Sequence, residues 1–293
     1  MRIVFIGAVE FSLRALERLV ALDAEIVGIC TLKESKFNAD HVDLTGVGVA
    51  HGIPCFYADD INSTEALIWI ESKAPDVIFC FGWSKLLKQE LLGLAPMGVV
   101  GFHPAALPAN RGRHPLIWAL VLGLDKTAST FFFMELGADN GDILSQREIP
   151  IADQDDARTL YDKVTETALV QIEEFLPQLV TGDSQRIKQN DLQVNTWRKR
   201  GRADGMIDWR MSAQSIHNLV RGLSKPYVGA HFLVDGKEIK VWRTVLYSQV
   251  EKNIEPGKVI QMSVNGPIVK CGEDAVCLMD TEPVFETSVG SYL

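Results

Sequence analysis

A histidine at the end of an apolar run is the first residue that could do chemistry. The residues MGVVGF (97–102) lead directly into His103, and PAALPANRGRHP (104–115) follows with prolines, arginines and a second histidine. The apolar run predicts a buried strand. Because ligands of open parallel sheets bind beyond the carboxyl ends of the strands, this position favours a working histidine over a histidine of the core. An imidazole exchanges protons near neutral pH, which makes His103 a candidate general acid and base.

A carboxylate occupies a second position of this kind. Asp139 follows the apolar run TFFFM in the turn ELGADNGD (135–142). Aspartate is common in such turns because its side chain bonds to the nearby backbone. The alternative interpretation pairs Asp139 with His103, since a nearby carboxylate favours the protonated ring and selects its tautomer. The sequence alone leaves both interpretations open.

Other kinds of site lack their motifs. A single glycine, Gly7, follows the first apolar run, so the G-x-G-x-x-G pattern of dinucleotide sites is missing, as is the phosphate-binding G-x-x-x-x-G-K-[ST] loop. The sequence has no H-E-x-x-H pattern and no cluster of cysteine and histidine that predicts a metal site. It also has no G-x-S-x-G pattern of a serine hydrolase. We therefore expect neither NAD nor a metal.

The first part of the chain alternates apolar runs with segments of helical spacing. The predicted strands are RIVFIG (2–7), EIVGIC (25–30), DVIFCFG (76–82), MGVVGFH (97–103), KTASTFFFM (126–134) and ILSQREIPI (143–151), and the predicted helices include residues 11–22 and 155–179. Such alternation predicts an α/β fold with a Rossmann-like parallel sheet and helices on both faces.

The last part of the chain has a different pattern. After one short helix (212–223), short apolar strands are separated by the turn dipeptides Asp235-Gly236, Pro256-Gly257 and Asn265-Gly266. This pattern predicts a small antiparallel β-barrel of the OB-like kind. We expect two domains, over residues 1–190 and 204–293, with a polar linker near 180–204.

Composition narrows the class of protein. The 293 residues carry a net charge of −9, which argues against a general nucleic-acid binder. The five cysteines are scattered and odd in number, as expected of reduced thiols in a cytoplasmic protein. No apolar run reaches the roughly 18 residues of a membrane helix, so we expect no membrane partner. The oligomeric state stays open.

Taken together, these motifs resemble those of the 10-formyltetrahydrofolate-dependent formyltransferases. The resemblance rests on FHPAALPANRGRHPLIWAL (102–120) followed by ELGADNGDIL (135–144), on APDVIFCFGWSKLLKQELLGLAP (74–96), and on residues 204–243. The family includes enzymes that act on methionyl-tRNA, on glycinamide ribonucleotide and on nucleotide-linked amino sugars. The closest resemblance is to the formyltransferase domain that modifies UDP-4-amino-4-deoxy-L-arabinose and to related sugar enzymes. The resemblance implies a formyltransferase that uses 10-formyltetrahydrofolate as co-substrate.

The resemblance also implies catalytic roles. The family uses an Asn-x-His pair and a distant aspartate. His103 matches the family's histidine, and Asp139 matches its aspartate. The asparagine position is Gly101 here. Loss of one donor to a developing oxyanion costs on the order of 10²–10³ in rate, so a substitute donor is expected. Asn110 is one candidate, and the Gly101 N–H or an ordered water is another; otherwise Asn110 simply satisfies its own turn.

The implied co-substrate pocket draws on two loops. The main chain of Lys85, Leu86 and Leu87 would recognise the pterin ring. Glu135, Leu136, Gly137 and Ala138 would line the same pocket. Arg113 would contact the folate. The loop 32–44, with Phe37, would lie beside the acceptor, or it is an ordinary solvated loop.

The acceptor is inferred from charge. The run WRKRGR (197–202) could contact phosphates, although most charged runs are simply solvated. Residues 204–293 hold 9 Lys and Arg against 11 Asp and Glu, a net charge of −2, whereas a tRNA-binding domain should be basic. We therefore expect a nucleotide-linked amino sugar as acceptor. The alternatives are methionyl-tRNA and, because of Gly101, a catalytically weak protein that binds folate or a sugar nucleotide.

Overall fold

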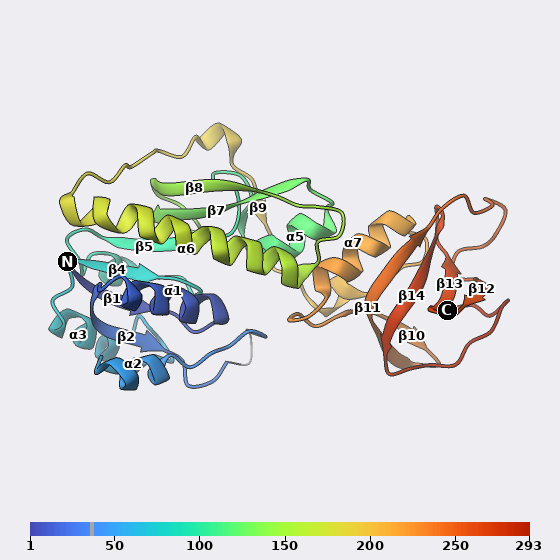
Figure 1. Cartoon of the computed structure of the whole chain (residues 1–293), viewed down its shortest axis with the longest axis horizontal. Coiled ribbons are helices and arrows are strands. Elements are labelled where there is room, and N and C mark those ends of the chain that lie inside the picture. Colours follow the sequence, from blue (N-terminus) through green and yellow to red (C-terminus); the bar gives the residue numbers. More distant parts are fainter. Residues whose placement is uncertain (36–37) are drawn as a thin grey trace. The chain divides into compact units, whose positions relative to one another are not determined.

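The computed structural model describes residues 1–35 and 38–293, so the predicted acceptor-loop residue Phe37 lies outside the described residues. The chain divides into two compact units (Figure 1). Unit 1 comprises Met1–Pro115, Thr127–Ile149 and Asp162–Trp197, and unit 2 comprises Leu116–Lys126, Pro150–Tyr161 and Arg198–Leu293. Two short segments inside the predicted first domain thus pack with unit 2. The division into functional domains at 1–190 and 204–293 stays a prediction.

The sheet of unit 1 has seven strands in the order β3-β2-β1-β4-β5-β7-β8. They are β1 (Arg2–Ile6), β2 (Glu25–Thr31), β3 (Cys55–Tyr57), β4 (Val77–Cys80), β5 (Val99–His103), β7 (Lys126–Phe133) and β8 (Ile143–Pro150). The strands from β3 to β5 are parallel, which confirms the prediction for this part. In contrast, β7 pairs with β5 antiparallel. The chain enters β7 at the end of the sheet where β5 finishes, so the two strands run in opposite directions.

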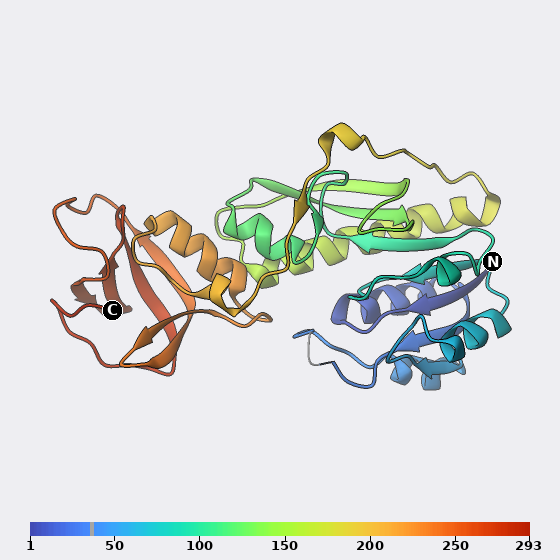
Figure 2. The same cartoon turned by 180° about the vertical axis from the view of Figure 1, so that it is seen from behind.

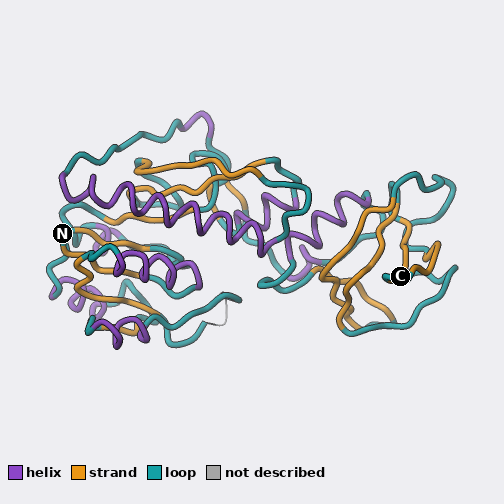
Figure 3. The backbone as a smooth tube through the Cα atoms, in the orientation of Figure 1, coloured by secondary structure: helices purple, strands orange, loops and turns teal. Residues whose placement is uncertain are grey.

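Helices cover both faces of this sheet (Figure 3). They are α1 (Glu10–Ala21), α2 (Thr45–His51), α3 (Thr64–Ser72), α4 (Gln89–Leu92) and α6 (Ala157–Thr181). On one face, Ile70 of α3 and Leu91 of α4 share a core cluster with the strand residue Val99. On the other face, Phe175 of α6 packs against Phe79 and Phe131. Because side chains alternate along a strand, Gly101 and His103 lie on the face of Val99.

Unit 2 contains a five-stranded sheet in the order β10-β11-β14-β13-β12. Its strands are β10 (Ala230–Val234), β11 (Lys237–Tyr247), β12 (Val259–Ser263), β13 (Gly266–Lys270) and β14 (Ala275–Glu282). All neighbouring pairs are antiparallel, as predicted. Two helices of this unit, α5 (Pro115–Val121) and α7 (Ala213–Leu223), contribute Ile117 and Leu219 to one core with the sheet residue Val241.

Among the described residues, no strand pairing closes this sheet into the predicted barrel, since the pairing order leaves β10 and β12 at opposite edges. Other segments occupy these edges. The Ile207 N–H donates to the His231 carbonyl on β10, and the Val259 N–H on β12 donates to the Ser291 carbonyl. These contacts cover part of each exposed strand edge.

The polar segment predicted as a linker contains short elements of its own. They are η1 (Asp191–Gln193), β9 (Thr196–Trp197) and η2 (Arg202–Gly205). Strand β9 pairs parallel with β6 (Arg111–Gly112), which lies in the loop that follows His103. Figure 2 shows this segment in yellow, running back along unit 1. Among the described helices, none combines the length and the apolar character that a membrane span requires.

Candidate active site

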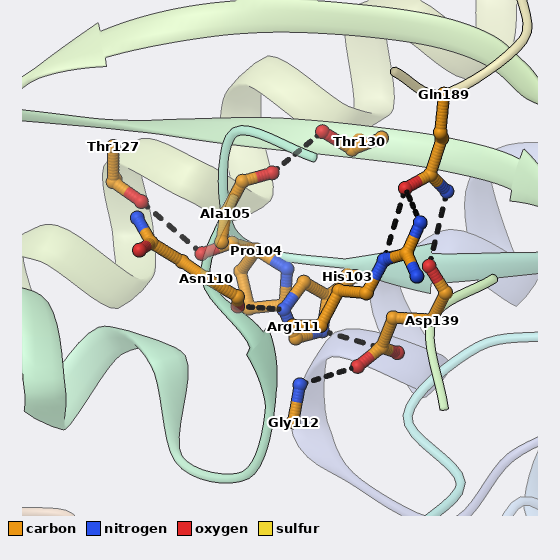
Figure 4. Close-up of polar contacts among 10 residues, drawn as sticks. All are labelled: His103, Pro104, Ala105, Asn110, Arg111, Gly112, Thr127, Thr130, Asp139 and Gln189. Atoms are coloured by element: carbon orange, nitrogen blue, oxygen red, sulfur yellow. Dashed lines mark hydrogen bonds and ion pairs between the residues drawn. The ribbon is translucent and has the colours of Figure 1, made fainter. Parts of the chain in front are cut away.

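His103 is the last residue of β5, and its side chain is buried, with 4% of its surface exposed. Its two ring nitrogens face two oxygen acceptors (Figure 4). Nδ1 lies 3.4 Å from Oδ1 of Asp139, and Nε2 lies 2.8 Å from the main-chain oxygen of Asn110. A neutral imidazole can donate to only one of these oxygens, whereas the doubly protonated ring can donate to both. Both ring nitrogens therefore have an oxygen within reach, and the contacts fix the orientation of the ring.

Asp139 is held in a fixed orientation. Its Oδ2 accepts a hydrogen bond of 2.7 Å from the Gly112 N–H, and its backbone is left-handed, with φ of 53°. Gly112 cannot be replaced easily, because its φ is +104° and an added Cβ would lie 2.2 Å from the Trp197 carbonyl oxygen. The structure thus brings Asp139 to His103, as the second interpretation of this aspartate requires.

Asn110 contributes its main chain to the site. Its carbonyl accepts from His103, and its N–H donates to Oδ1 of Asn195 at 2.7 Å. In Figure 4 the Asn110 side-chain amide points away from the His103 ring. Asn110 therefore does not offer the amide donor that the sequence suggested, because its left-handed backbone, with φ of 63°, turns the carbonyl toward the ring instead.

Gly101 lies on the same face of β5 as His103, and the space beside it is filled. A Cβ built on Gly101 would lie 2.7 Å from Cγ and 2.9 Å from Sδ of Met134, and 3.2 Å from Cε1 of Phe132. The Met134 thioether thus takes the room that an asparagine side chain would need. Sulfur of this kind is at most a weak acceptor, so it supplies no donor for an oxyanion.

The predicted pterin loop is tied down by its neighbours. Lys85 donates from Nζ to the Asp59 carbonyl, and the Leu86 carbonyl accepts from Nδ2 of Asn62 at 3.0 Å. The Leu86 side chain is 64% exposed, whereas Leu87 is part of the core. Main-chain recognition by this loop stays a prediction.

Arg113 contacts this same loop. Its NH1 donates to the Ser84 carbonyl at 2.8 Å, so part of the guanidinium predicted to contact folate holds the loop instead. The predicted lining residues Glu135, Leu136, Gly137 and Ala138 form the turn that leads into Asp139, and the Leu136 side chain is 58% exposed.

A buried hydrogen-bond donor next to this loop, the Trp83 side chain, bears on whether a folate fits there. Within the described part of the chain, Nε1 of Trp83 is buried and has no hydrogen-bond partner. Trp83 directly precedes Ser84 and packs against the core cluster that contains Leu87. An unpaired buried N–H costs about 1–3 kcal/mol, which a ligand with acceptor atoms, such as a pterin, can recover. Residues 1–35 and 38–293 contain no group of three His, Cys, Asp or Glu side chains that could hold a metal.

Sequence reasoning missed two residues of this site, Gln189 and Asn195. Both lie in the segment predicted as a linker. Gln189 donates from Nε2 to the Asp139 carbonyl at 3.0 Å, and its Oε1 accepts from Arg111. Periodicity could not find them, since the segment has none; its only signal is the density of side-chain amides in QNDLQVN (189–195).

The basic run of residues 197–202 is largely engaged within unit 2. Arg198 forms an ion pair with Asp204, and Arg202 forms one with Glu238. Hydrogen bonds from the Arg198 guanidinium and the Gly201 N–H hold the pKa of Asp204 well below its usual range. Arg200 is buried, with its guanidinium 4.5 Å from the centre of the Trp118 ring. These contacts favour a structural role for the run.

Comparison with known proteins agrees with the motifs. Residues 2–174 match the family described as "Formyl transferase", and residues 200–284 match "Formyl transferase, C-terminal domain". The methionyl-tRNA formyltransferase of Caldanaerobacter subterraneus subsp. tengcongensis is 31% identical over 295 aligned positions, covering 99% of this chain and 94% of the relative.

Two solved structures show the same fold at lower identity. A sugar 3N-formyl transferase, WlaRD, solved in the presence of dTDP and 5-N-formyl-THF, is 16% identical with a TM-score of 0.72, covering 97% of this chain and 99% of its own. HypX from Aquifex aeolicus, in complex with tetrahydrofolic acid, is 19% identical with a TM-score of 0.70, covering 96% of this chain and 44% of its own. With both domain matches and a relative similar over the whole chain, this protein belongs to the formyl transferase family of enzymes.

Proposed function

We propose that this protein transfers the formyl group of 10-formyltetrahydrofolate to a primary amine, with His103 as general acid and base. The observation that carries the proposal is the buried His103 at the end of β5, with Asp139 at Nδ1 and the Asn110 carbonyl at Nε2. A histidine held in this way has a fixed orientation and a defined place for its proton.

Formyl transfer forms a bond between the amine nitrogen and the formyl carbon and breaks the bond from that carbon to the folate nitrogen. When bound, 10-formyltetrahydrofolate supplies the formyl carbon that the amine attacks. His103 then takes a proton from the amine side and returns one to the folate nitrogen, and Asp139 stabilises the charged ring. With Met134 beside Gly101, the donors left for charge on the formyl oxygen are the His103 ring, the Gly101 N–H or an ordered water.

The co-substrate would bind beside the loops that flank this histidine. The main chain of Lys85–Leu87, the turn Glu135–Ala138 and the free donor of Trp83 supply groups of the kind that an aminopyrimidinone ring needs. Support for this placement comes from the exposed side chains of Leu86 and of Leu136 and from the unpartnered Trp83 Nε1. Arg113 would add a cation while it holds Ser84.

The first acceptor to consider is methionyl-tRNA. It is the substrate named for the relative that is 31% identical over nearly the whole of both chains. The sugar enzyme is similar at only 16% identity, which bears on the fold alone. Sequence similarity thus puts methionyl-tRNA before the amino sugar, whereas the net charge of residues 204–293 suggested the opposite order.

A nucleotide-linked amino sugar is the second candidate. The observation in its favour is that the arginines of the basic run already have partners in unit 2. Arg198 and Arg202 form ion pairs, and Arg200 packs on an aromatic ring. Residues 204–293 also carry a net charge of −2, from 9 basic and 11 acidic residues. A small acceptor needs fewer phosphate contacts than a tRNA does.

A direct competition between acceptors tests the proposal. The protein is mixed with 10-formyltetrahydrofolate and either methionyl-tRNA or a panel of UDP- and dTDP-linked amino sugars, and product is followed by mass spectrometry. We expect turnover with one class, and a KM that rises steeply with salt if that class is tRNA. His103→Ala should remove turnover while circular dichroism shows an unchanged fold.

The outcomes distinguish a methionyl-tRNA formyltransferase, a sugar-nucleotide formyltransferase and a binding protein without turnover. Turnover with methionyl-tRNA alone supports the first candidate, and turnover with a sugar nucleotide alone supports the second. Binding of 10-formyltetrahydrofolate without turnover in either case would support a binding protein and contradict the enzymatic proposal. Wild-type rates in His103→Ala would remove His103 from the mechanism.

A further inference from the structure

We propose that the segment Gln189–Trp197, here called the brace, contains two residues that position His103. In the brace, Gln189 and Asn195 act as positioning residues, each of which holds one of the two acceptors of His103. This inference deepens the proposed function and rests on it for its kinetic test. Both residues belong to unit 1, as do His103, Asn110 and Asp139.

Gln189 holds the turn that carries Asp139. Its Nε2 donates to the carbonyls of Asp139 and Gly141, at 3.0 and 2.8 Å. Its Oε1 accepts two hydrogen bonds from the Arg111 guanidinium, from Nε at 3.1 Å and from NH2 at 2.6 Å. One amide thus joins the Asp139 turn to the loop after His103, and Figure 4 shows its contacts with Asp139 and Arg111.

Asn195 holds the other acceptor. Its Oδ1 accepts a hydrogen bond from the Asn110 N–H at 2.7 Å, and the Asn110 carbonyl oxygen is the acceptor that faces Nε2 of His103. Asn110 has a left-handed backbone, which its side chain tolerates but which external contacts must stabilise. The Asn195 bond stabilises the conformation that turns this carbonyl toward the ring.

The backbone of the brace joins the two contacts. The Arg111 N–H donates to the Asn195 carbonyl and the Arg113 N–H to the Trp197 carbonyl, both at 3.0 Å. Gly112 lies between them and donates to Asp139. A displacement of the brace therefore moves both oxygens that face His103, and a misplacement of about 1 Å can cost about 10²-fold in rate.

Conservative variants show whether the hydrogen bonds of these two side chains matter or only their size. Gln189→Glu keeps an acceptor for Arg111 but loses the donor to the Asp139 carbonyl, so it should behave like Gln189→Ala. Asn195→Asp keeps the acceptor for the Asn110 N–H, so it should retain activity that Asn195→Ala loses. Gln193→Ala is the matched control, because this exposed residue lies in the same segment at η1.

The kinetic experiment measures kcat and the KM for 10-formyltetrahydrofolate in all five variants. We expect kcat to fall about 10- to 100-fold in Gln189→Ala, Gln189→Glu and Asn195→Ala, as for other groups that orient a working side chain. The KM should change little, and Asn195→Asp and Gln193→Ala should stay near wild type. Unchanged kcat in both alanine variants, or an equal loss in Gln193→Ala, would overturn the inference.

A second measurement does not depend on the acceptor. The ¹⁵N chemical shifts of the His103 ring report which nitrogens are protonated and hydrogen-bonded. We expect them to change in Gln189→Ala and Asn195→Ala and to be restored in Asn195→Asp. If wild type transfers no formyl group, the proposed function fails, and these shifts still decide the inference: identical shifts in all variants would refute it.

Discussion

Gly101 and His103 share one face of β5, but their surroundings differ. His103 faces two oxygens, whereas the space at Gly101 is taken by the Met134 side chain. Met134, and less closely Phe132, therefore occupy the space of the asparagine that the family resemblance places at this position. This arrangement explains how the chain can keep the His103–Asp139 pair and lack the asparagine.

Substitution of Gly101 by asparagine tests this explanation. In Gly101→Asn the new Cβ would meet Met134 at 2.7 Å, so we expect a slower enzyme and a loss of stability of about 1–3 kcal/mol, as for overpacked cores. The double variant Gly101→Asn/Met134→Ala removes the two shortest contacts and should recover rate relative to Gly101→Asn. Both are compared with Met134→Ala by kcat/KM and by denaturant unfolding. A single variant faster than wild type would show that Met134 moves aside easily.

Asp139→Asn separates the charge of this residue from its shape. An asparagine side chain can still accept from the Gly112 N–H, but it no longer places a negative charge 3.4 Å from Nδ1 of His103. We expect kcat to fall at least about tenfold with little change in stability, because proton transfer by a positioned side chain is worth about 10²–10⁴ in rate. Steady-state kinetics and thermal melts check this result. Equal rates in wild type and variant would mean that the carboxylate only forms the turn.

At the scale of elements, a half-buried histidine contacts the sheet of unit 2 from α7. His217 contacts Thr244 of β11 through Nδ1, 3.0 Å from Oγ1. Burial and the nearby charge of Arg221 lower the pKa of His217. Protonation of this side chain therefore opposes the packing of α7.

The pH dependence of stability follows from this pKa. The folded pKa lies below the unfolded value of about 6.5, so between the two the unfolded chain binds more protons. The free energy of unfolding should therefore fall as pH decreases from above about 6.5 through the folded pKa. In His217→Gln, which keeps a hydrogen-bonding side chain, the difference in unfolding free energy between about pH 7.5 and about pH 5 should be smaller. Parallel pH profiles of urea unfolding for the two proteins would exclude His217 as the source.

At the scale of the whole molecule, each unit has its own core, and the free cysteines are distributed between them. Burial raises the pKa of Cys80 and of Cys271 to about 12 and moves the pKa of Cys30 well above its usual range. Cys55 also has a raised pKa but is only half-buried. Thiolates are the reactive form, so these thiols differ in reactivity.

Alkylation of the native protein measures this difference. With iodoacetamide at about pH 8, near the usual thiol pKa, we expect Cys55 to react first and Cys30, Cys80 and Cys271 to stay unmodified until the protein is denatured. Peptide mass spectrometry with time gives the order. Labelling of Cys80 as fast as Cys55 would show that unit 1 opens on the time scale of the experiment, and labelling of Cys271 would show this for unit 2.

Local pattern was enough to predict much of this protein. The apolar runs predicted the parallel strands β1, β2, β4 and β5, because burial on both faces leaves a continuous apolar sequence. The turn dipeptides predicted the antiparallel strands of unit 2, and the end of an apolar run located His103. These features depend on residues that are neighbours in the chain.

Only the tertiary structure decided what surrounds His103. The direction of the Asn110 amide, the Met134 side chain beside Gly101 and the contact of Gln189 with Arg111 had no counterpart in any local pattern. Arg111 and Gln189 are 78 residues apart, and they meet because β9 pairs with the loop after β5. Periodicity records which side chains are buried within one element. Contacts between loops depend on how distant elements pack, because a polar loop residue has many partners of equal chemistry and the fold selects among them.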